Sequence, residues 1–324
     1  MRDATPNGLP IEEAAIALAR GELVGMPTET VYGLAADAAN PDAVARVFAA
    51  KGRPQFNPLI SHVADLEMAM REGVLDGRAL ALAGAFWPGP LTLVVPVAET
   101  GQTSELARAG LSTIGLRVPR HPIAQALLRA HAGPVSAPSA NPSGKLSPTA
   151  ADDVRAGLGD SVSVVLDGGA SETGIESTIV GVIPGEPVRL LRPGAIARED
   201  IEALVGPLTL PRPDKITAPG QLTSHYAPRA AVRLNASEAQ EGEVLLAFGP
   251  GAPPAAANLS EDGDTVEAAA NLYRQLRELD AQGAYCIAVM PIPETGLGEA
   301  INDRLNRAAA LRDDGVSRHP SEVT

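Results

Sequence analysis

The sequence predicts a two-domain α/β protein, with a larger domain over residues 1–206, a linker over 207–229 and a smaller domain over 230–324. A chain of 324 residues is long enough for two domains. Helix-like and strand-like segments alternate through the larger region, which favours a layered α/β architecture whose loops carry the chemistry. Five prolines and no hydrophobic period mark the segment from Pro207 to Pro228, which predicts an extended linker.

The larger domain is expected to begin with a helix and a short strand. A helix is predicted over Pro10–Arg20, because proline suits its first turn and Gly21 stands just past its end. The apolar segment Leu23–Met26 then predicts a strand that runs into a turn over residues 27–30.

The remaining elements are predicted from apolar runs and from helix start and stop signals. A second helix is expected to follow Asn40, whose side chain can cap it, and to stop at Gly52. Further strands are expected at 59–63, 91–95, 112–118, 162–167, 177–182 and 188–191, and helices at 122–132 and 148–158. The smaller domain is expected to be Rossmann-like, with strands at 243–248 and 285–290 and helices at 265–281 and 298–312.

The composition excludes several classes of protein. The net charge is −13 and aromatic residues make up 3%, which argues against a dedicated nucleic-acid binder with a basic, stacking surface. Cys286 is the only cysteine and the histidines lack ligand spacing, so no protein metal site is predicted. No apolar run reaches the roughly 20 residues of a membrane helix, and no signal pattern starts the chain, so a cytoplasmic protein without membrane contact is expected.

Lys51-Gly52-Arg53 is the strongest candidate for binding phosphate. The glycine allows a sharp turn, so that the two cationic side chains can converge. No acidic residue lies between Ala43 and Ala64, which reverses the local sign of charge in an acidic chain. Lysine acts as a point charge, and arginine can hold two oxygens of a phosphate or carboxylate. The alternative is that both residues only complement the dipole at a helix C-terminus.

A second candidate segment, residues 135–147, is rich in hydroxyl groups. It offers four serines, Asn141 and Lys145, and its small residues let backbone N–H groups approach a ligand. Ser147 stands where it could cap the next helix, and a helix N-terminus favours anions. An ordinary Ser/Pro/Gly loop has the same composition. Because the common glycine-rich nucleotide-binding loops are absent from the sequence, any phosphate must be held by other segments such as these two.

Six motifs resemble, in order, those of the YrdC-like family. They are Pro27-Thr-Glu-Thr-Val-Tyr-Gly-Leu34, Lys51-Gly-Arg-Pro54, Ser112-Thr-Ile-Gly-Leu-Arg-Val-Pro119, Ser136-Ala-Pro-Ser-Ala-Asn141, Glu176-Ser-Thr-Ile179 and Arg192-Pro-Gly194. The segment Ser224-His-Tyr-Ala-Pro228 and the tail from Gly296 to Ala310 resemble the long form of the family. The resemblance implies a twisted mixed sheet with helices, a linker over the active site and a small Rossmann-like C-terminal domain.

The resemblance also implies roles for individual residues. The catalytic residues would be Lys51, Arg53, Ser139 and Asn141. ATP would be bound by Arg53, Asn57, Thr113, Ser139, Ser147, Arg192 and Tyr226, and L-threonine by Thr30, His62, Arg117, the Ala137 backbone and Ser177. Tyr226 could instead be an apolar anchor that pins the linker to a domain. For His62 the alternative is a structural role, which is more common for a lone histidine at the end of an apolar strand.

The activity implied by the resemblance is the synthesis of threonylcarbamoyl adenylate and pyrophosphate from L-threonine, bicarbonate and ATP. The product would serve the modification of tRNA next to the anticodon and would be passed to a threonylcarbamoyl transferase complex. Mg²⁺ would be held mainly by the phosphates of ATP. The net charge does not support direct tRNA contact. The linker and the smaller domain are expected to act as a lid, because Tyr226 is implied to contact the nucleotide and yet lies outside the larger domain.

Two other functions fit parts of the sequence. Relatives in hydrogenase maturation use carbamoyl phosphate, but they resemble larger proteins with acylphosphatase and zinc-finger modules, for which a single cysteine leaves no place. The second is an RNA-binding or ribosome-associated module without catalysis. Such a module would need a basic surface with stacking aromatic residues, and the acidity and low aromatic content of this chain argue against it.

Overall fold

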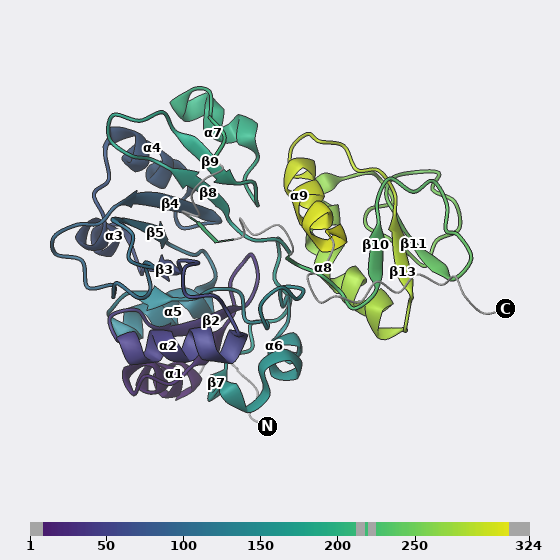
Figure 1. Cartoon of the computed structure of the whole chain (residues 1–324). Helices are drawn as coiled ribbons and strands as arrows, with labels where there is room; N and C mark the ends of the chain where they lie inside the picture. The colour runs from purple at the N-terminus through teal and green to yellow at the C-terminus, as the bar shows by residue number, and fades with distance from the viewer. Residues whose placement is uncertain (1–8, 212–217, 220–224, 311–324) are drawn as a thin grey trace.

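The structure, a computed structural model, describes residues 9–211, 218–219 and 225–310, which form two lobes (Figure 1). The N-terminal lobe contains a nine-stranded mixed sheet in the order β7-β1-β2-β6-β3-β5-β4-β8-β9. Its strands are β1 (Val24–Met26), β2 (Gly33–Asp37), β3 (Ile60–His62), β4 (Leu91–Pro96), β5 (Thr113–Arg117), β6 (Val135–Ser136), β7 (Val164–Val165), β8 (Thr178–Gly181) and β9 (Arg189–Arg192). The predicted mixed α/β fold is confirmed.

Helices cover both faces of this sheet. They are α1 (Leu9–Ala19), α2 (Pro41–Lys51), α3 (Leu66–Glu72), α4 (Gly77–Phe86), α5 (Pro122–His131), α6 (Ala151–Leu158) and α7 (Arg198–Val205), with a 3₁₀ turn at Gly159–Ser161. Successive residues of β2 point to opposite faces. Ala35 packs in a cluster with α1 and α5, whereas Leu34 and Ala36 pack with α2 and α6. Helices α3, α4 and α7 pack on β4, β5, β8 and β9 in a further cluster.

Helices with clear end signals lie close to their predicted positions. The Asn40 side chain caps α2 by accepting the backbone N–H groups of Asp42 and Ala43, at 3.0 and 3.2 Å. The helix expected over 148–158 begins only at Ala151, because Asp153 accepts the N–H groups of Thr149 and Ala150 and so caps the helix there. The sequence did not predict β2, α3, α4 or α7.

The C-terminal lobe is built on a parallel four-stranded sheet in the order β10-β13-β11-β12. Its elements are β10 (Ala231–Arg233), β11 (Glu243–Ala247), β12 (Ala257–Asn258), α8 (Thr265–Ala281), β13 (Cys286–Val289) and α9 (Gly298–Ala309). All its strand pairs are parallel, as expected of a Rossmann-like domain. Figure 1 shows α8 and α9 on the side of the sheet that faces the N-terminal lobe.

The two lobes touch through backbone as well as side chains. Gly174 has a φ of +74°, and a Cβ atom on it would lie 2.5 Å from Ala269 O and from the Cα of Ala270 in α8. The Arg198–Glu299 ion pair, from α7 to α9, adds a second contact. Of the predicted linker, residues 212–217 and 220–224 lie outside the described residues. Within the described part of the chain, no helix combines the length and the apolarity that crossing a membrane requires.

Candidate active site

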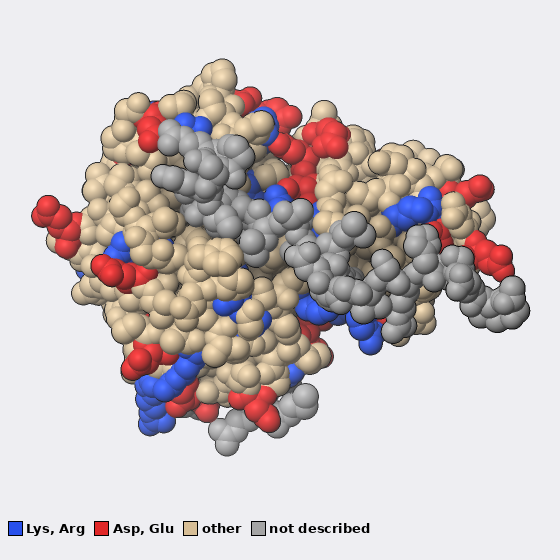
Figure 2. Space-filling model, viewed as in Figure 1, with Lys and Arg blue, Asp and Glu red and all other residues tan. Residues whose placement is uncertain are grey.

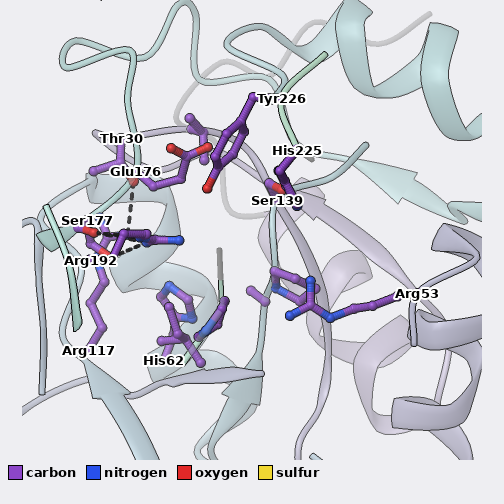
Figure 3. Close-up of a pocket in the computed structure, with 15 residues that line it drawn as sticks. Thr30, Arg53, His62, Arg117, Ser139, Glu176, Ser177, Arg192, His225 and Tyr226 are labelled. Carbon is purple, nitrogen blue, oxygen red and sulfur yellow. Dashed lines mark hydrogen bonds between the residues drawn. The ribbon is translucent and has the colours of Figure 1, made fainter. Parts of the chain in front are cut away.

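The candidate active site is a pocket at one edge of the nine-stranded sheet, next to the C-terminal lobe (Figure 3). The parallel strands β3 and β5 end there side by side, with His62 opposite Arg117. The N-terminal end of β8 and the C-terminal end of β9 bring Ser177 and Arg192 to the same edge. The pocket is lined by Thr30, Val31, Arg53, Ile60, His62, Arg117, Ala137, Pro138, Ser139, Glu176, Ser177, Arg192, Pro219, His225 and Tyr226.

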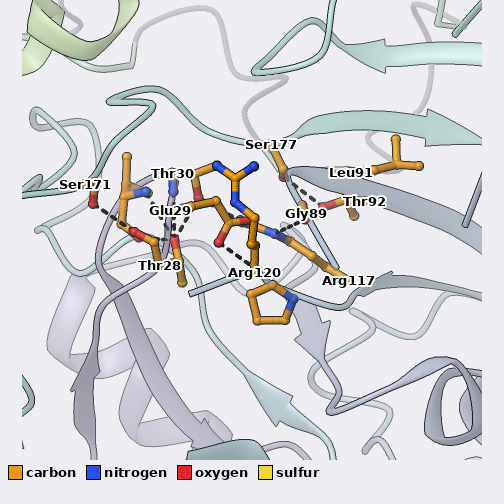
Figure 4. A network of polar contacts seen from close by, with 12 residues as sticks. Thr28, Glu29, Thr30, Gly89, Leu91, Thr92, Arg117, Arg120, Ser171 and Ser177 are labelled. Atoms are coloured by element: carbon orange, nitrogen blue, oxygen red, sulfur yellow. Dashed lines mark hydrogen bonds and ion pairs between the residues drawn. The ribbon is translucent and has the colours of Figure 1, made fainter. Parts of the chain in front are cut away.

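All five residues expected at threonine line this pocket, and Arg117 is the main cation among them. Its Nη2 forms an ion pair with Glu29 at 2.6 Å, its Nη1 donates to Thr30 Oγ1 at 2.9 Å, and its Nε donates to Gly89 O at 3.2 Å (Figure 4). Burial raises the pKa of Glu29, but the charge and hydrogen bond of Arg117, with two backbone hydrogen bonds, outweigh this effect, so the net shift of its pKa is downward. A guanidinium has five N–H donors. These bonds use three of the donors of Arg117, and the two remaining N–H groups suit a carboxylate.

The turn after β1 places the partners of Arg117. The Oγ1 of Thr28 donates to Val31 O at 2.5 Å and lies 3.3 Å from the backbone nitrogens of Thr30 and Val31, which donate to it. A hydroxyl that bonds its own backbone in this way stabilises a tight turn. The turn aims Thr30 and the intervening Glu29 at the end of β5, as Figure 4 shows.

His62 is a neutral hydrogen-bonding group. Burial, together with the charge of Arg117, lowers its pKa to about 3. Its Nδ1 is buried and has no hydrogen-bond partner in the described structure. Because a buried polar atom normally has a partner, this nitrogen is suited to a polar group of a ligand.

The free energy of unfolding is expected to fall as the pH drops from 7 to 5. Burial lowers the pKa values of His62 and His225 to about 3 in the folded protein, against about 6.5 in the unfolded chain. Between these values only the unfolded chain takes up the protons, so stability is present above pH 6.5 and is lost as the pH falls toward 3. Each histidine should cost roughly 2 kcal/mol between pH 7 and 5. Urea unfolding at several pH values measures how the free energy of unfolding depends on pH. A His62→Gln variant with the same pH dependence as the wild type would contradict the lowered pKa of His62.

Two further arginines, Arg53 and Arg192, line the pocket. Arg53 donates to Asn57 O and Pro58 O, at 3.3 and 3.0 Å, and burial with a smaller effect of Arg192 lowers its pKa to about 10. It therefore keeps its charge at neutral pH. Arg192 donates from Nη2 to Ser177 O at 2.9 Å. Two cationic side chains in one pocket favour a polyanionic ligand.

Lys51 acts on the loop beside the pocket, and it is not among the pocket-lining residues. Its Nζ donates to Ser139 O at 2.5 Å and to Asn141 O. Burial, and then the charge of Arg53, lowers the pKa of Lys51 well below its usual value. Asn141 in turn donates from Nδ2 to Pro142 O and to Lys145 O, at 2.7 and 2.9 Å. The structure thus brings the four expected catalytic residues together, with Arg53 and Ser139 at the pocket and Lys51 and Asn141 behind it.

Replacing Lys51 by methionine is expected to lower the free energy of unfolding by about 2 kcal/mol, because two buried carbonyl groups lose their donor. The loop that carries Ser139 should shift, so activity should fall as well. Urea unfolding and turnover measure the two effects. The matched control is Lys145→Met, in the same loop, whose side chain is exposed and should be replaceable without loss of stability. A Lys51→Met protein as stable and as active as the Lys145→Met protein would refute this role.

Three residues expected at ATP do not line the pocket. Asn57 is buried, its carbonyl accepts from Arg53, and its side-chain Oδ1 has no partner in the described structure. Thr113 lies at the start of β5, far along the strand from Arg117. Ser147 is buried and donates to Glu176 at 2.5 Å.

Four further residues, Glu176, His225, Pro219 and Glu29, were not predicted from the sequence as site residues. The structure places the first three in the pocket wall and pairs Glu29 with Arg117. Three of the four belong to quoted motifs: Glu29 to the first, Glu176 to the fifth and His225 to the linker segment. Membership of those motifs was the available signal, whereas nothing in the sequence marks Pro219.

Comparisons with known proteins agree over both lobes. A family model described as telomere recombination matches residues 16–194, and a model described as the C-terminal domain of threonylcarbamoyl-AMP synthase matches residues 196–310. The threonylcarbamoyl-AMP synthase of Bacillus subtilis is 38% identical, over 96% of each chain. That of Pyrococcus abyssi is 39% identical, over 93% of this chain and 94% of the relative. The crystal structure of P. abyssi Sua5 complexed with L-threonine has a TM-score of 0.85 at 37% identity and covers 92% of this chain and 94% of that chain.

Proposed function

Because this chain belongs to the family of the threonylcarbamoyl-AMP synthases, we propose that it joins L-threonine, bicarbonate and ATP into threonylcarbamoyl-AMP with release of pyrophosphate. The chain is accordingly a nucleotidyltransferase-type enzyme. One observation carries the choice of substrates. The five residues expected at threonine and four of the seven expected at ATP line the same pocket.

The end of the pocket at β3 and β5 is proposed to bind threonine. A relative 37% identical in sequence was solved as a complex with L-threonine, which supports this substrate. The two remaining N–H groups of Arg117 suit the carboxylate of the amino acid. The unpartnered Nδ1 of His62 and the hydroxyl of Thr30 suit its polar groups.

The proposed reaction has two steps. The threonine amine attacks the carbon of bicarbonate, and loss of water gives N-carboxythreonine. One oxygen of the new carboxylate then attacks the α-phosphorus of ATP, the bond to the bridging oxygen breaks, and pyrophosphate leaves. No covalent bond to the enzyme is needed. The chain contributes position and charge, with Arg53 and Arg192 placed to neutralise the phosphates.

Mg²⁺ is proposed to enter with ATP, held mainly by its phosphates and by water. Glu176 is the carboxylate that lines the pocket, and its oxygens accept bonds from Ser147, Tyr273 and Arg304. No group of three or more potential metal ligands among His, Cys, Asp and Glu occurs in residues 9–211, 218–219 and 225–310. The chemistry of an ion carried by the substrate would be to neutralise charge on the leaving pyrophosphate.

The product is proposed to serve the modification of tRNA next to the anticodon, after transfer to a threonylcarbamoyl transferase complex. A mixed anhydride of a carbamate and AMP is an activated acyl donor, so a transferase that accepts it must follow. On the face in Figure 2, acidic and basic side chains are interspersed, which does not favour an RNA-binding module as the alternative function.

The test is pyrophosphate release by the purified full chain with threonine, bicarbonate or ATP omitted in turn, and with serine in place of threonine. Release should require all three substrates and should be weaker with serine. Release that continues without threonine, or that needs carbamoyl phosphate, would contradict the proposal.

A further inference from the structure

The carboxylate of Glu176 joins the two lobes at the wall of the candidate active site. It belongs to the N-terminal lobe and accepts the hydroxyl of Ser147 at 2.5 Å. From the C-terminal lobe it accepts Arg304 Nε of α9 at 2.9 Å, and the hydroxyl of Tyr273 in α8 lies 3.0 Å from both carboxylate oxygens. Burial raises the pKa of Glu176, but the charges of Arg304 and Arg192 and the hydrogen bonds lower it to about 2, so the group is ionised.

The same two side chains of the C-terminal lobe hold the ring of Tyr226. The guanidinium carbon of Arg304 lies 5.2 Å from the centroid of that ring, within the range of a cation–π contact. The ring centroids of Tyr226 and Tyr273 are 5.8 Å apart. Tyr226 has a φ of +59°, a conformation that is unfavourable for any residue with a side chain. Its position therefore depends on these surrounding contacts.

Figure 3 shows Glu176 beside Tyr226, with Thr30 next to them, at the edge of the pocket that lies away from His62. At this edge α8 also holds the loop that ends at Ser147, because Arg277 Nη2 donates to Ser147 O at 2.9 Å. The proposed threonine end is different, since its contacts come from the N-terminal lobe alone.

We propose that Glu176 is a positioning residue for ATP. Its carboxylate fixes Arg304 and Tyr273 of the C-terminal lobe, and these two side chains set the place of Tyr226. The inference rests on the proposed function, because it takes ATP to be the ligand at this end of the pocket. It assigns the C-terminal lobe a part in building the nucleotide site that is separate from covering it.

The decisive variant is Glu176→Gln in the full chain. Glutamine keeps the shape of the side chain, but only its oxygen can accept a hydrogen bond. The amide nitrogen cannot, so either the Arg304 or the Ser147 donor loses its acceptor. The KM for ATP should rise about tenfold or more, as expected when hydrogen bonds to a charged group are lost. The KM for threonine should change less than about twofold, since Arg117 and Thr30 keep their partners. Calorimetry with a non-hydrolysable ATP analogue should show the same loss as the KM.

The matched control is Arg198→Gln, which breaks the Arg198–Glu299 ion pair between α7 and α9. This pair also joins the lobes and ends on α9, but neither residue lines the candidate active site. The control should lower the stability of the chain and leave the KM for ATP unchanged. If it raises that KM as much as Glu176→Gln does, the effect comes from lobe docking in general and the inference is overturned.

Tyr273→Phe is a milder second variant, which removes one hydroxyl and keeps the ring. It decides the question if Glu176→Gln does not fold. A rise of about threefold in the KM for ATP, with the KM for threonine unchanged, is the expected result. No rise, or an equal rise for both substrates, overturns the inference. Combining Tyr273→Phe with Glu176→Gln should add little to the effect of Glu176→Gln alone, because both act through one carboxylate.

The analogue titration separates the two proposals. A wild-type chain that binds the analogue but releases no pyrophosphate with all three substrates contradicts the proposed function, and the affinities of the variants then still decide the role of Glu176. An active wild type with a Glu176→Gln variant of normal ATP affinity sinks the positioning role alone. A wild type that does not bind the analogue sinks both.

Discussion

Replacing Arg53 by alanine is expected to lower kcat by about 10²–10³, the loss seen when one preorganised donor to a developing charge is removed. Arg53 lines the pocket and keeps its charge at neutral pH. Its bonds to Asn57 O and Pro58 O hold the guanidinium in one orientation, so little reorganisation is needed when ATP binds. Pyrophosphate release at saturating substrates measures the effect.

Two controls accompany this variant. Arg53→Lys keeps the charge but loses the planar two-pronged geometry, so it should recover only part of the activity. Arg46→Ala removes an exposed arginine from α2, the helix that ends just before Arg53, and should leave turnover unchanged because Arg46 lies outside the pocket. If Arg53→Ala turns over like Arg46→Ala, the role of Arg53 in phosphate chemistry is wrong.

Replacing Arg117 by methionine is expected to destabilise the fold by about 3–5 kcal/mol, because Glu29 would be left as a buried charge without its partner. The Arg117 and Glu29 side chains are only 5% and 2% exposed, so water cannot replace the lost ion pair. The same variant should raise the KM for threonine by at least about tenfold, since hydrogen bonds to a charged group are lost. Urea unfolding and the threonine dependence of pyrophosphate release measure the two effects.

The double variant Glu29→Gln with Arg117→Met separates them. Removing both charges should restore much of the stability, because no isolated charge remains buried. It should not restore threonine binding, because the donor to the substrate carboxylate is still missing. Recovery of threonine affinity in the double variant would show that Arg117 acts only through the fold.

The elements that the sequence predicted are those whose signals are local. Asn40 and Gly52 mark the two ends of α2, and both act as the pattern indicates. Strand β2 was missed because Gly33–Asp37 has little β-propensity of its own. It is a strand because β1 and β6 pair with it on both sides. Helices α3 and α4 do have aspartate caps, at Asp65 and Asp76, but both helices are short and their patterns are weak.

The candidate site was predictable as a set of residues but not as an arrangement. The motif resemblance named the residues on the pocket wall, yet it did not show which way each side chain points. Lys51 bonds carbonyl groups 88 and 90 residues further along the chain, and the sequence does not specify such a contact. The bonds of Glu176 to α8 and α9 likewise depend on how the two lobes meet.

The register of β3 against β5 has a mechanical consequence. His62 and Arg117 stand on adjacent parallel strands whose spacing is set by backbone hydrogen bonds, so their separation is as stiff as the sheet itself. The other end of the pocket owes its shape to side chains that meet across a boundary between lobes, which is a more compliant construction. In the proposed binding mode, the amino acid is held by the stiffer part of the molecule and the bulkier nucleotide by the more compliant part.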